Sequence, residues 1–298
     1  MKYRSRERSF ASSTGKLVDN VDDVDHLPEP HFSDHIELLN LIRLYGREKN
    51  ILKVRKLHAD IVEKRRVVKN AYIATALITT YAKCGVMKKA EEVFDQLPTQ
   101  DVVAWNALIA GYVRNGFNDK TLECFRRLQD ARIFPDGVTY VCVLKACGIL
   151  GSLKTGEDIE VEVRKQGLLQ KDTVLNNALL GMYAKCDSLS EAQNVFDEIQ
   201  TPNTISWAAL VTAYVDNGSN RETLKLFGSM QHKGILPNNV IFFCALRACG
   251  VLVNLDTGGD IHLTVTKMGF EEDLMISSTL IDMYAKCGSL LDARAIFD

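Results

Sequence analysis

The tetrapeptide Tyr81-Ala82-Lys83-Cys84 recurs as Tyr183-Ala184-Lys185-Cys186 and again as Tyr284-Ala285-Lys286-Cys287. Each copy is followed by a Phe-Asp pair, at Phe94-Asp95, Phe196-Asp197 and Phe297-Asp298. The only two tryptophans, Trp105 and Trp207, are separated by the same interval of about one hundred residues. Self-similarity at a long fixed period predicts an array of repeats in which each unit packs on its neighbours.

Each unit has the pattern of two helices. In 102–136, Trp105, Leu108, Ile109 and Tyr112 form one apolar stripe at helical spacing, and Asn115-Gly116 is a typical helix end. A second stripe begins at Leu122, and Phe134-Pro135 closes the unit because proline cannot continue a helix. The predicted fold is an all-α solenoid of antiparallel helix pairs, with the repeated aromatic side chains mainly in its core.

The predicted units alternate in length. They are 35–70 (long), 71–101 (short), 102–136 (standard), 137–172 (long), 173–203 (short), 204–238 (standard), 239–273 (long) and 274–298 (short, and cut off before its expected end). Residues 1–34 lack helical periodicity, and we interpret them as a disordered leader or a transit segment, since 1–16 is rich in Arg and Ser.

Composition restricts the function classes. The net charge is −2, so no global field draws the chain to nucleic acid or membrane, but 43–69 is a strongly basic segment. No apolar run is long enough for a membrane span. Eight cysteines without a secretory signal point to free thiols in a reducing compartment.

Three motif types recur in rotation and resemble the pentatricopeptide repeat (PPR) family of plant organelles, specifically its PLS subfamily of long, short and standard repeats. They are Met283-Tyr284-Ala285-Lys286-Cys287-Gly288 for the short repeat, Val143-Leu144-Lys145-Ala146-Cys147-Gly148 for the long repeat and Trp105-Asn106-Ala107-Leu108-Ile109-Ala110-Gly111-Tyr112 for the standard repeat. The resemblance covers 35–298 and implies a right-handed superhelix that binds single-stranded RNA, one nucleotide per repeat.

By the family's rule, the fifth and last residues of a repeat face one base. The pair Thr75/Asp101 is similar to the family's G reader, Asn106/Asp136 to its U reader and Asn177/Asn203 to a pyrimidine reader, whereas Ala208/Asn238 lacks a polar fifth residue. The long-repeat pairs have an apolar fifth residue, which cannot hydrogen-bond a base, and are therefore weakly base-facing: Leu39/Asn70, Val141/Asp172 and Phe243/Asp273. The implied register, 5′ to 3′, is any-G-U-any-pyrimidine-any-any.

The second residue of each repeat packs between neighbouring bases in that family. Here all eight are apolar or aromatic: Ile36, Tyr72, Val103, Val138, Val174, Ile205, Val240 and Met275. Burial in the core at the start of each helix is the alternative explanation. Basic residues at a position that contacts phosphate in some relatives are Lys83, Arg114, Lys185 and Lys286. A basic residue near a helix C-terminus is equally explained as a partner of the helix dipole.

No set of residues for catalysis or metal binding stands apart from the repeats. Cys142/Cys147 and Cys244/Cys249 supply only two ligands per site, fewer than structural zinc requires. One repeat position holds His58, Glu160 and His262, an exchange that a catalytic role would not tolerate. The His-x-Glu and Pro-Cys-x-x-Cys motifs of cytidine deaminases do not occur in this chain. We therefore expect no enzyme activity, cofactor or metal.

The resulting hypothesis is a sequence-selective RNA-binding protein of a mitochondrion or chloroplast, acting as a specificity factor for RNA editing or processing with other factors supplied in trans. The alternative is a helical-repeat scaffold that binds a protein or peptide in its concave groove. The apolar fifth residues of the long repeats favour the scaffold, and the polar Thr/Asn with Asp/Asn pairs favour RNA.

Overall fold

The computed structural model describes residues 35–63, 70–170 and 172–298. These described residues form sixteen α-helices and no strand, which confirms the all-α prediction. The predicted leader 1–34 and the last part of the first unit, 64–69, lie outside the described residues. Within the described part of the chain, no helix is both long and apolar enough to span a bilayer.

The helices alternate along the chain as first and second members of antiparallel pairs. They are α1 (His35–Arg47), α2 (Ile51–Glu63), α3 (Ala71–Lys83), α4 (Met87–Asp95), α5 (Val102–Arg114), α6 (Asn118–Asp130), α7 (Gly137–Leu150), α8 (Leu153–Lys165), α9 (Thr173–Lys185), α10 (Leu189–Glu198), α11 (Thr204–Asp216), α12 (Asn220–His232), α13 (Asn239–Leu252), α14 (Leu255–Lys267), α15 (Leu274–Lys286) and α16 (Leu290–Phe297).

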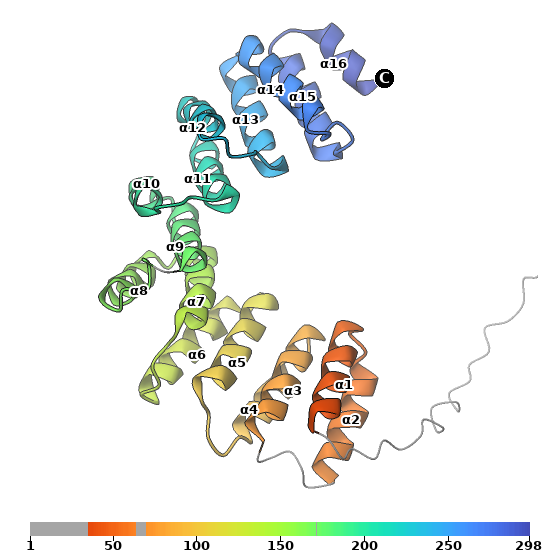
Figure 1. The fold of residues 1–298 in the computed structure, drawn as a ribbon, viewed down its shortest axis with the longest axis vertical. Helices are drawn as coiled ribbons and strands as arrows, with labels where there is room; N and C mark the ends of the chain where they lie inside the picture. Colours follow the sequence, from red (N-terminus) through yellow and green to blue (C-terminus); the bar gives the residue numbers. More distant parts are fainter. Residues whose placement is uncertain (1–34, 64–69, 171) are drawn as a thin grey trace, which may run out of the picture.

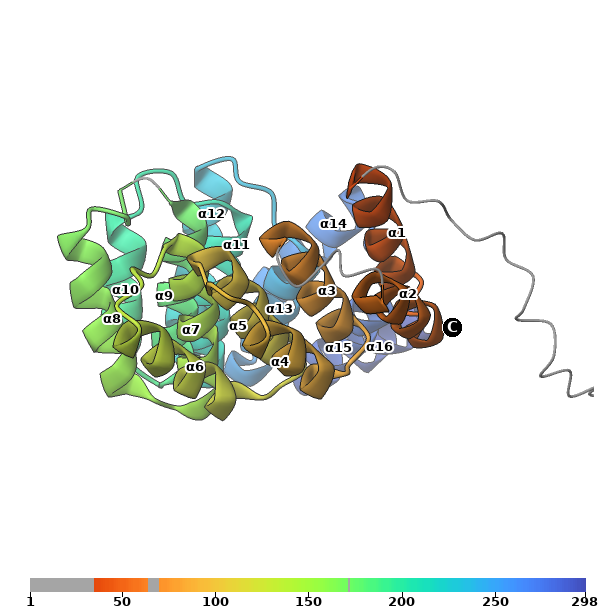
Figure 2. The same ribbon diagram turned by 90° about the horizontal axis from the view of Figure 1, so that it is seen from below.

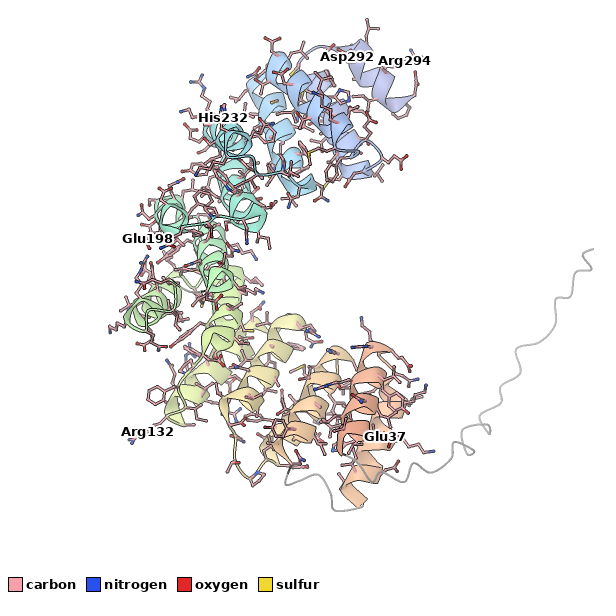
Figure 3. The ribbon with its side chains drawn as sticks, in the orientation of Figure 1. Glu37, Arg132, Glu198, His232, Asp292 and Arg294 are labelled. Carbon is pink, nitrogen blue, oxygen red and sulfur yellow. The ribbon has the colours of Figure 1, made fainter. Side chains whose placement is uncertain are left out.

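The pairs follow a curved path, from α1 at one end to α16 at the other (Figure 1). In the perpendicular view the helices run from α1 across to α8 and back to α16, so that the two ends overlap there, while Figure 1 separates them along the long axis (Figure 2). The array therefore has the form of a superhelix. Arg132, Glu198 and His232 point outward from its convex side (Figure 3).

Packing between repeats follows one rule throughout the described residues. Each odd-numbered helix packs closely against the next odd-numbered helix, whereas the backbones of successive even-numbered helices stay apart and are bridged by long charged side chains, such as Lys120 of α6 with Glu91 of α4 at 3.1 Å and Arg164 of α8 with Glu198 of α10 at 2.7 Å. Each second helix instead packs against its own partner and, up to α14, against the first helix that follows. Because first helices touch and second helices spread apart, the first helices form the short inner side of the arc and the second helices its long outer side.

The repeated aromatic residues lie in the core, as predicted. Trp105 of α5 meets Phe94 of the preceding α4 edge-on, with ring centroids 4.6 Å apart. Trp207 of α11 meets Phe196 of α10 in the same way at 4.7 Å. Both tryptophans are almost fully buried. The Phe-Asp pairs that follow the first two Tyr-Ala-Lys-Cys copies thus supply an edge-to-face contact that joins one repeat to the next.

The cysteines are part of this packing. Cys124, Cys147, Cys244 and Cys249 are buried, and the other four are half-buried. Burial raises the pKa of each thiol, to about 12 for Cys147 and Cys249, which keeps them protonated and unreactive. No group of three or more His, Cys, Asp or Glu side chains among the described residues has the geometry to hold a metal ion.

The tyrosine of each Tyr-Ala-Lys-Cys copy bonds to the preceding second helix. Tyr81 and His58 share a hydrogen bond of 2.8 Å, and Tyr284 and His262 one of 3.0 Å. Tyr183 donates to the carboxylate of Glu160. The position that exchanges His for Glu therefore holds an acceptor for a tyrosine hydroxyl, which explains why both residue types serve there.

Removing these hydroxyls gives a graded test of the network. Tyr183→Phe should lower the free energy of unfolding by about 1.5–3 kcal/mol, because its hydroxyl bonds a charged carboxylate, and Tyr81→Phe by about 1 kcal/mol, because its partner is neutral. Denaturant unfolding of both variants and of wild type measures which of the two hydroxyls contributes more to the free energy of unfolding. Equal losses would show that the charge on Glu160 adds nothing.

The Tyr81–His58 pair also predicts a pH dependence. Burial lowers the pKa of His58 below its ordinary value of 6.5, and Lys89 lowers it further while Glu92 opposes the shift. A histidine whose pKa is depressed by folding contributes stability above the unfolded pKa and loses it as pH falls through the folded pKa. Between about pH 7.5 and pH 5, wild type should therefore lose more thermal stability than His58→Gln, which keeps an acceptor for Tyr81. Identical losses would contradict this assignment.

Among the four non-glycine residues with positive φ in the described part of the chain, Val253 is the β-branched one. Val253 has a φ of +54°, and the residues at the same place in the two preceding cycles, Gly151 and Lys49, have φ values of +65° and +52°. A β-branched residue is strongly disfavoured in this left-handed region, and glycine is not.

Val253→Gly should therefore stabilise the protein. Left-handed strain costs about 1–2 kcal/mol, and glycine's greater freedom in the unfolded chain offsets about 0.5–1 kcal/mol of that. The net gain expected is up to about 1 kcal/mol in denaturant unfolding. Gly151→Val, the reverse change at the matching position, is the control and should destabilise.

Candidate nucleic-acid interface

The last residue of each complete predicted unit is the N-cap of the next first helix. The seven residues are Asn70, Asp101, Asp136, Asp172, Asn203, Asn238 and Asp273. In each, the side-chain Oδ1 accepts from one or two backbone N–H groups of the first turn. Asp and Asn serve almost equally as N-caps, so capping alone explains why only these two residue types occur.

Capping leaves the second terminal atom of each side chain outside the helix start. That atom is an acceptor, Oδ2, in Asp and a donor, Nδ2, in Asn. Exchange of Asp for Asn at this position therefore changes the hydrogen-bonding chemistry at the surface without removing the cap. Sequence reasoning assigned these residues to bases and missed the cap, although Asp or Asn directly before an apolar helical stripe is its usual signature.

The pair Asn106/Asp136 is joined directly. Asn106 Nδ2 donates to Asp136 Oδ1 and Oδ2 at 2.9 and 3.0 Å. Asn106 lies on α5 and Asp136 lies at the start of α7, so the fifth residue of one repeat and its last residue meet where two first helices adjoin. The structure thus brings together two side chains that the sequence separates by thirty residues.

The other pairs are less tightly connected. In Asn177/Asn203, Asn177 Oδ1 accepts from Ser206 Oγ at 2.6 Å, and Ser206 also lies 3.2 Å from Asn203 Oδ1. Thr75 and Asp101 line one hollow without a direct bond between them. The apolar fifth residues Leu39, Val141, Ala208 and Phe243 are half-buried against the core. Their partners Asn70, Asp172, Asn238 and Asp273 cap helices as described above.

The second residues of the repeats are on the surface. All eight are exposed, from 38% for Val240 to 80% for Tyr72. Burial at the helix start, the alternative raised from the sequence, is therefore wrong for these positions. Because one exposed apolar residue recurs at the same position of every repeat, these residues form a row of separate apolar contact surfaces along the array.

A hollow of about 560 Å³ shows how these positions combine. Its lining includes the second residues Tyr72 and Val103 of two successive repeats, and the pair Thr75/Asp101 between them. The basic residues Arg43, Arg47 and Lys83 line the same hollow. Arg43 and Arg47 were not among the sequence-predicted site residues, although they lie in the basic segment noted there.

The four candidate phosphate-binding residues differ in their surroundings. Lys83 is half-buried at the hollow, and Arg114 and Lys185 are exposed. Lys286 forms an ion pair of 2.7 Å with Asp282 on its own helix. Asp216 occupies the matching position in the second standard unit and lies 3.6 Å from Arg247. This repeat position is therefore basic in most repeats, but the charge of Lys286 is already paired with an acidic side chain and Asp216 is itself acidic.

Profiles of repeat families match most of the array. The profile described as the PPR repeat family matches 100–148, the pentatricopeptide repeat domain matches 195–251, and the PPR repeat matches 72–102, 177–201 and 276–298. Together these matches cover more than half of the chain.

Similar curated proteins include several from Arabidopsis thaliana. A chloroplastic pentatricopeptide repeat-containing protein is 31% identical over 274 residues, covering 92% of this chain and 28% of that protein. A mitochondrial one is 34% identical over 231 residues, covering 77% of this chain and 22% of that protein. The chain spans well under half the length of these relatives.

Among solved structures, the pentatricopeptide repeat protein PPR10 in complex with an 18-nucleotide psaJ RNA element superposes with a TM-score of 0.61. The identity is 19%, and the alignment covers 76% of this chain and 34% of that one. This likeness shows the fold. With the profile matches and the relatives it leads to one conclusion: the chain belongs to the pentatricopeptide repeat family.

Proposed function

We propose that this protein binds single-stranded RNA along the inner face of its arc, one nucleotide per repeat. The hollow at Tyr72, Thr75, Asp101 and Val103 is the observation that carries the proposal. It holds, in one place, two exposed apolar side chains for stacking and two polar side chains for a base edge. Bases stack readily on apolar and aromatic side chains, and donors and acceptors beside them supply selectivity.

Charge at the hollow supports the same proposal. Arg43, Arg47 and Lys83 surround a single acidic group, Asp101, so the local field is positive although the whole chain carries a net charge of −2. Phosphate neutralisation supplies much of the affinity in nucleic-acid binding and makes it salt-dependent. PPR10, which has this fold, was solved bound to an RNA element.

The peptide-scaffold alternative rested on the apolar fifth residues. Leu39, Val141 and Phe243 are half-buried against the core, which limits the apolar surface that they offer to a peptide. The row that is exposed instead consists of the second residues, each separated from the next by a repeat. Such spacing suits successive bases better than a continuous peptide.

The finer assignment forms part of the proposal. The rotation of long, short and standard units with the boundaries given above supports our proposal that the protein belongs to the PLS subfamily. Its relatives are chloroplastic and mitochondrial proteins, which supports an organellar role. We propose that it acts there as a specificity factor for RNA editing or processing, with the proposed register any-G-U-any-pyrimidine-any-any and with catalysis supplied by other proteins.

The pair Asn106/Asp136 provides the test at one nucleotide. Asn106→Thr creates the combination found at Thr75/Asp101, and preference should change from U to G by about 1–3 kcal/mol. The variant loses the bond to Asp136, so a fall of about 1 kcal/mol in stability is also expected. The measurement is affinity for four RNA oligonucleotides that differ only at the nucleotide facing 102–136, at two salt concentrations.

Asn194→Thr, the same change on an exposed residue of α10, is the matched control and should leave the ranking of bases as in wild type. The salt dependence should not change in either variant, because neither alters a phosphate contact. If wild type and Asn106→Thr rank the four bases identically, these residues do not recognise RNA. If wild type binds no RNA but binds peptides, the scaffold alternative is correct.

A further inference from the structure

The third residue of each repeat varies with the fifth residue of the repeat before it. A hydroxyl occurs at this position only in Thr139 and Ser206, which follow the two units whose fifth residue is asparagine. Elsewhere the fifth residue is not an amide and the third residue of the next unit is apolar: Ile73, Ala104, Leu175, Ile241 and Ile276. The coincidence of hydroxyl with amide suggests that the two side chains work together.

Contacts in the structure join them directly. Thr139 Oγ1 donates to Asn106 Oδ1 at 2.6 Å, and Ser206 Oγ donates to Asn177 Oδ1 at the same distance. Both hydroxyl residues are fully buried, so they do not contact a ligand themselves. Each comes from the repeat that follows the asparagine.

The orientation of the Asn106 amide follows from its partners. A carboxylate only accepts hydrogen bonds, so the amide nitrogen must face Asp136 and the amide oxygen must face Thr139. One N–H of Asn106 shared between the two carboxylate oxygens of Asp136 satisfies both contacts, which leaves the second N–H to donate to a base and a further lone pair of Oδ2 to accept from it. Uracil presents an acceptor beside a donor on its pairing edge, which complements this arrangement, whereas cytosine presents the reverse.

We propose that Thr139 and Ser206 are positioning residues that fix the amide orientation of Asn106 and Asn177, so that base selectivity at these two nucleotides depends on a buried hydroxyl of the next repeat. The inference rests on the proposed RNA-binding function. It assigns the specificity of a repeat to three side chains, of which the third lies outside the repeat.

Thr139 also takes part in the N-terminal cap of α7, since Asp136 N donates to its hydroxyl at 3.3 Å. A purely structural role would lower stability and affinity equally for every RNA. A positioning role changes the ratio of affinities between bases, which gives a readout that capping alone does not move. Ser206 allows the same comparison at a helix without the reciprocal capping box.

The experiment compares wild type, Thr139→Val, Thr139→Ser and Ser206→Ala for binding to oligonucleotides with U or C at the nucleotide facing 102–136, and with a pyrimidine or a purine at the nucleotide facing 173–203. Thr139→Val should reduce the U-to-C ratio at its own nucleotide about two- to tenfold, the range that one neutral hydrogen bond supports. Thr139→Ser keeps the hydroxyl and should keep the ratio. Ser206→Ala should reduce selectivity only at the nucleotide facing 173–203.

The nucleotide facing 71–101 is the internal control, because Ala104 already lacks a hydroxyl there and no variant should alter its selectivity. Thermal unfolding establishes that each variant is folded, and Ser206→Ala decides the question if Thr139→Val is not. Unchanged ratios in folded variants, with RNA still bound selectively by wild type, would refute the inference and leave the proposed function intact. Absence of RNA binding by wild type would refute both.

Discussion

Contact between successive first helices is the constraint on which this structure depends. No helix pair buries its apolar surface alone, and in the described residues every contact links helices at most two places apart in the chain. The inner helices therefore form one continuous row, and each outer helix packs against inner helices without packing closely on the next outer helix. The arc, the exposed row of second residues and the meeting of fifth with last residues all follow from this arrangement.

Glycine allows successive first helices to approach one another closely at particular points. A Cβ on Gly148 would lie 3.2 Å from the backbone Cα of Met182, and one on Gly250 would lie 3.4 Å from the Cα of Met283. Both glycines occupy the same place in their repeats, directly after the buried Cys147 and Cys249. The long-repeat signature Ala-Cys-Gly is thus explained by close approach of one first helix to the next.

Much of this was predictable from residue patterns. The period predicts the repeats, and the apolar stripe at Trp105, Leu108 and Tyr112 predicts the helices, because apolar residues at helical spacing fit few other secondary structures. The cap at Asp101 and its equivalents was within reach of the sequence but was obscured by a functional interpretation. The bond between Thr139 and Asn106 could not be predicted from the sequence, because it crosses a repeat boundary and depends on how closely two helices approach.

The caps separate two demands on one side chain. In Asp136, Oδ1 holds the first turn of α7, and Oδ2 remains directed to Asn106. Because folding needs the cap, this position holds Asp or Asn whatever its role in recognition. The choice between them is neutral for the fold and is free to serve recognition.

The wide spacing of the second helices, which are bridged by ion pairs such as Arg164–Glu198 and not by close packing, also has a mechanical consequence. Straightening the arc moves the outer helices toward one another, into space that only these flexible charged side chains bridge in the described residues, while the inner helices keep their shared surfaces. Bending of this kind needs only small rotations at each inner contact, distributed over the whole array. The protein should accordingly behave as an elastic spring, whose pitch and curvature change while its individual repeats remain rigid.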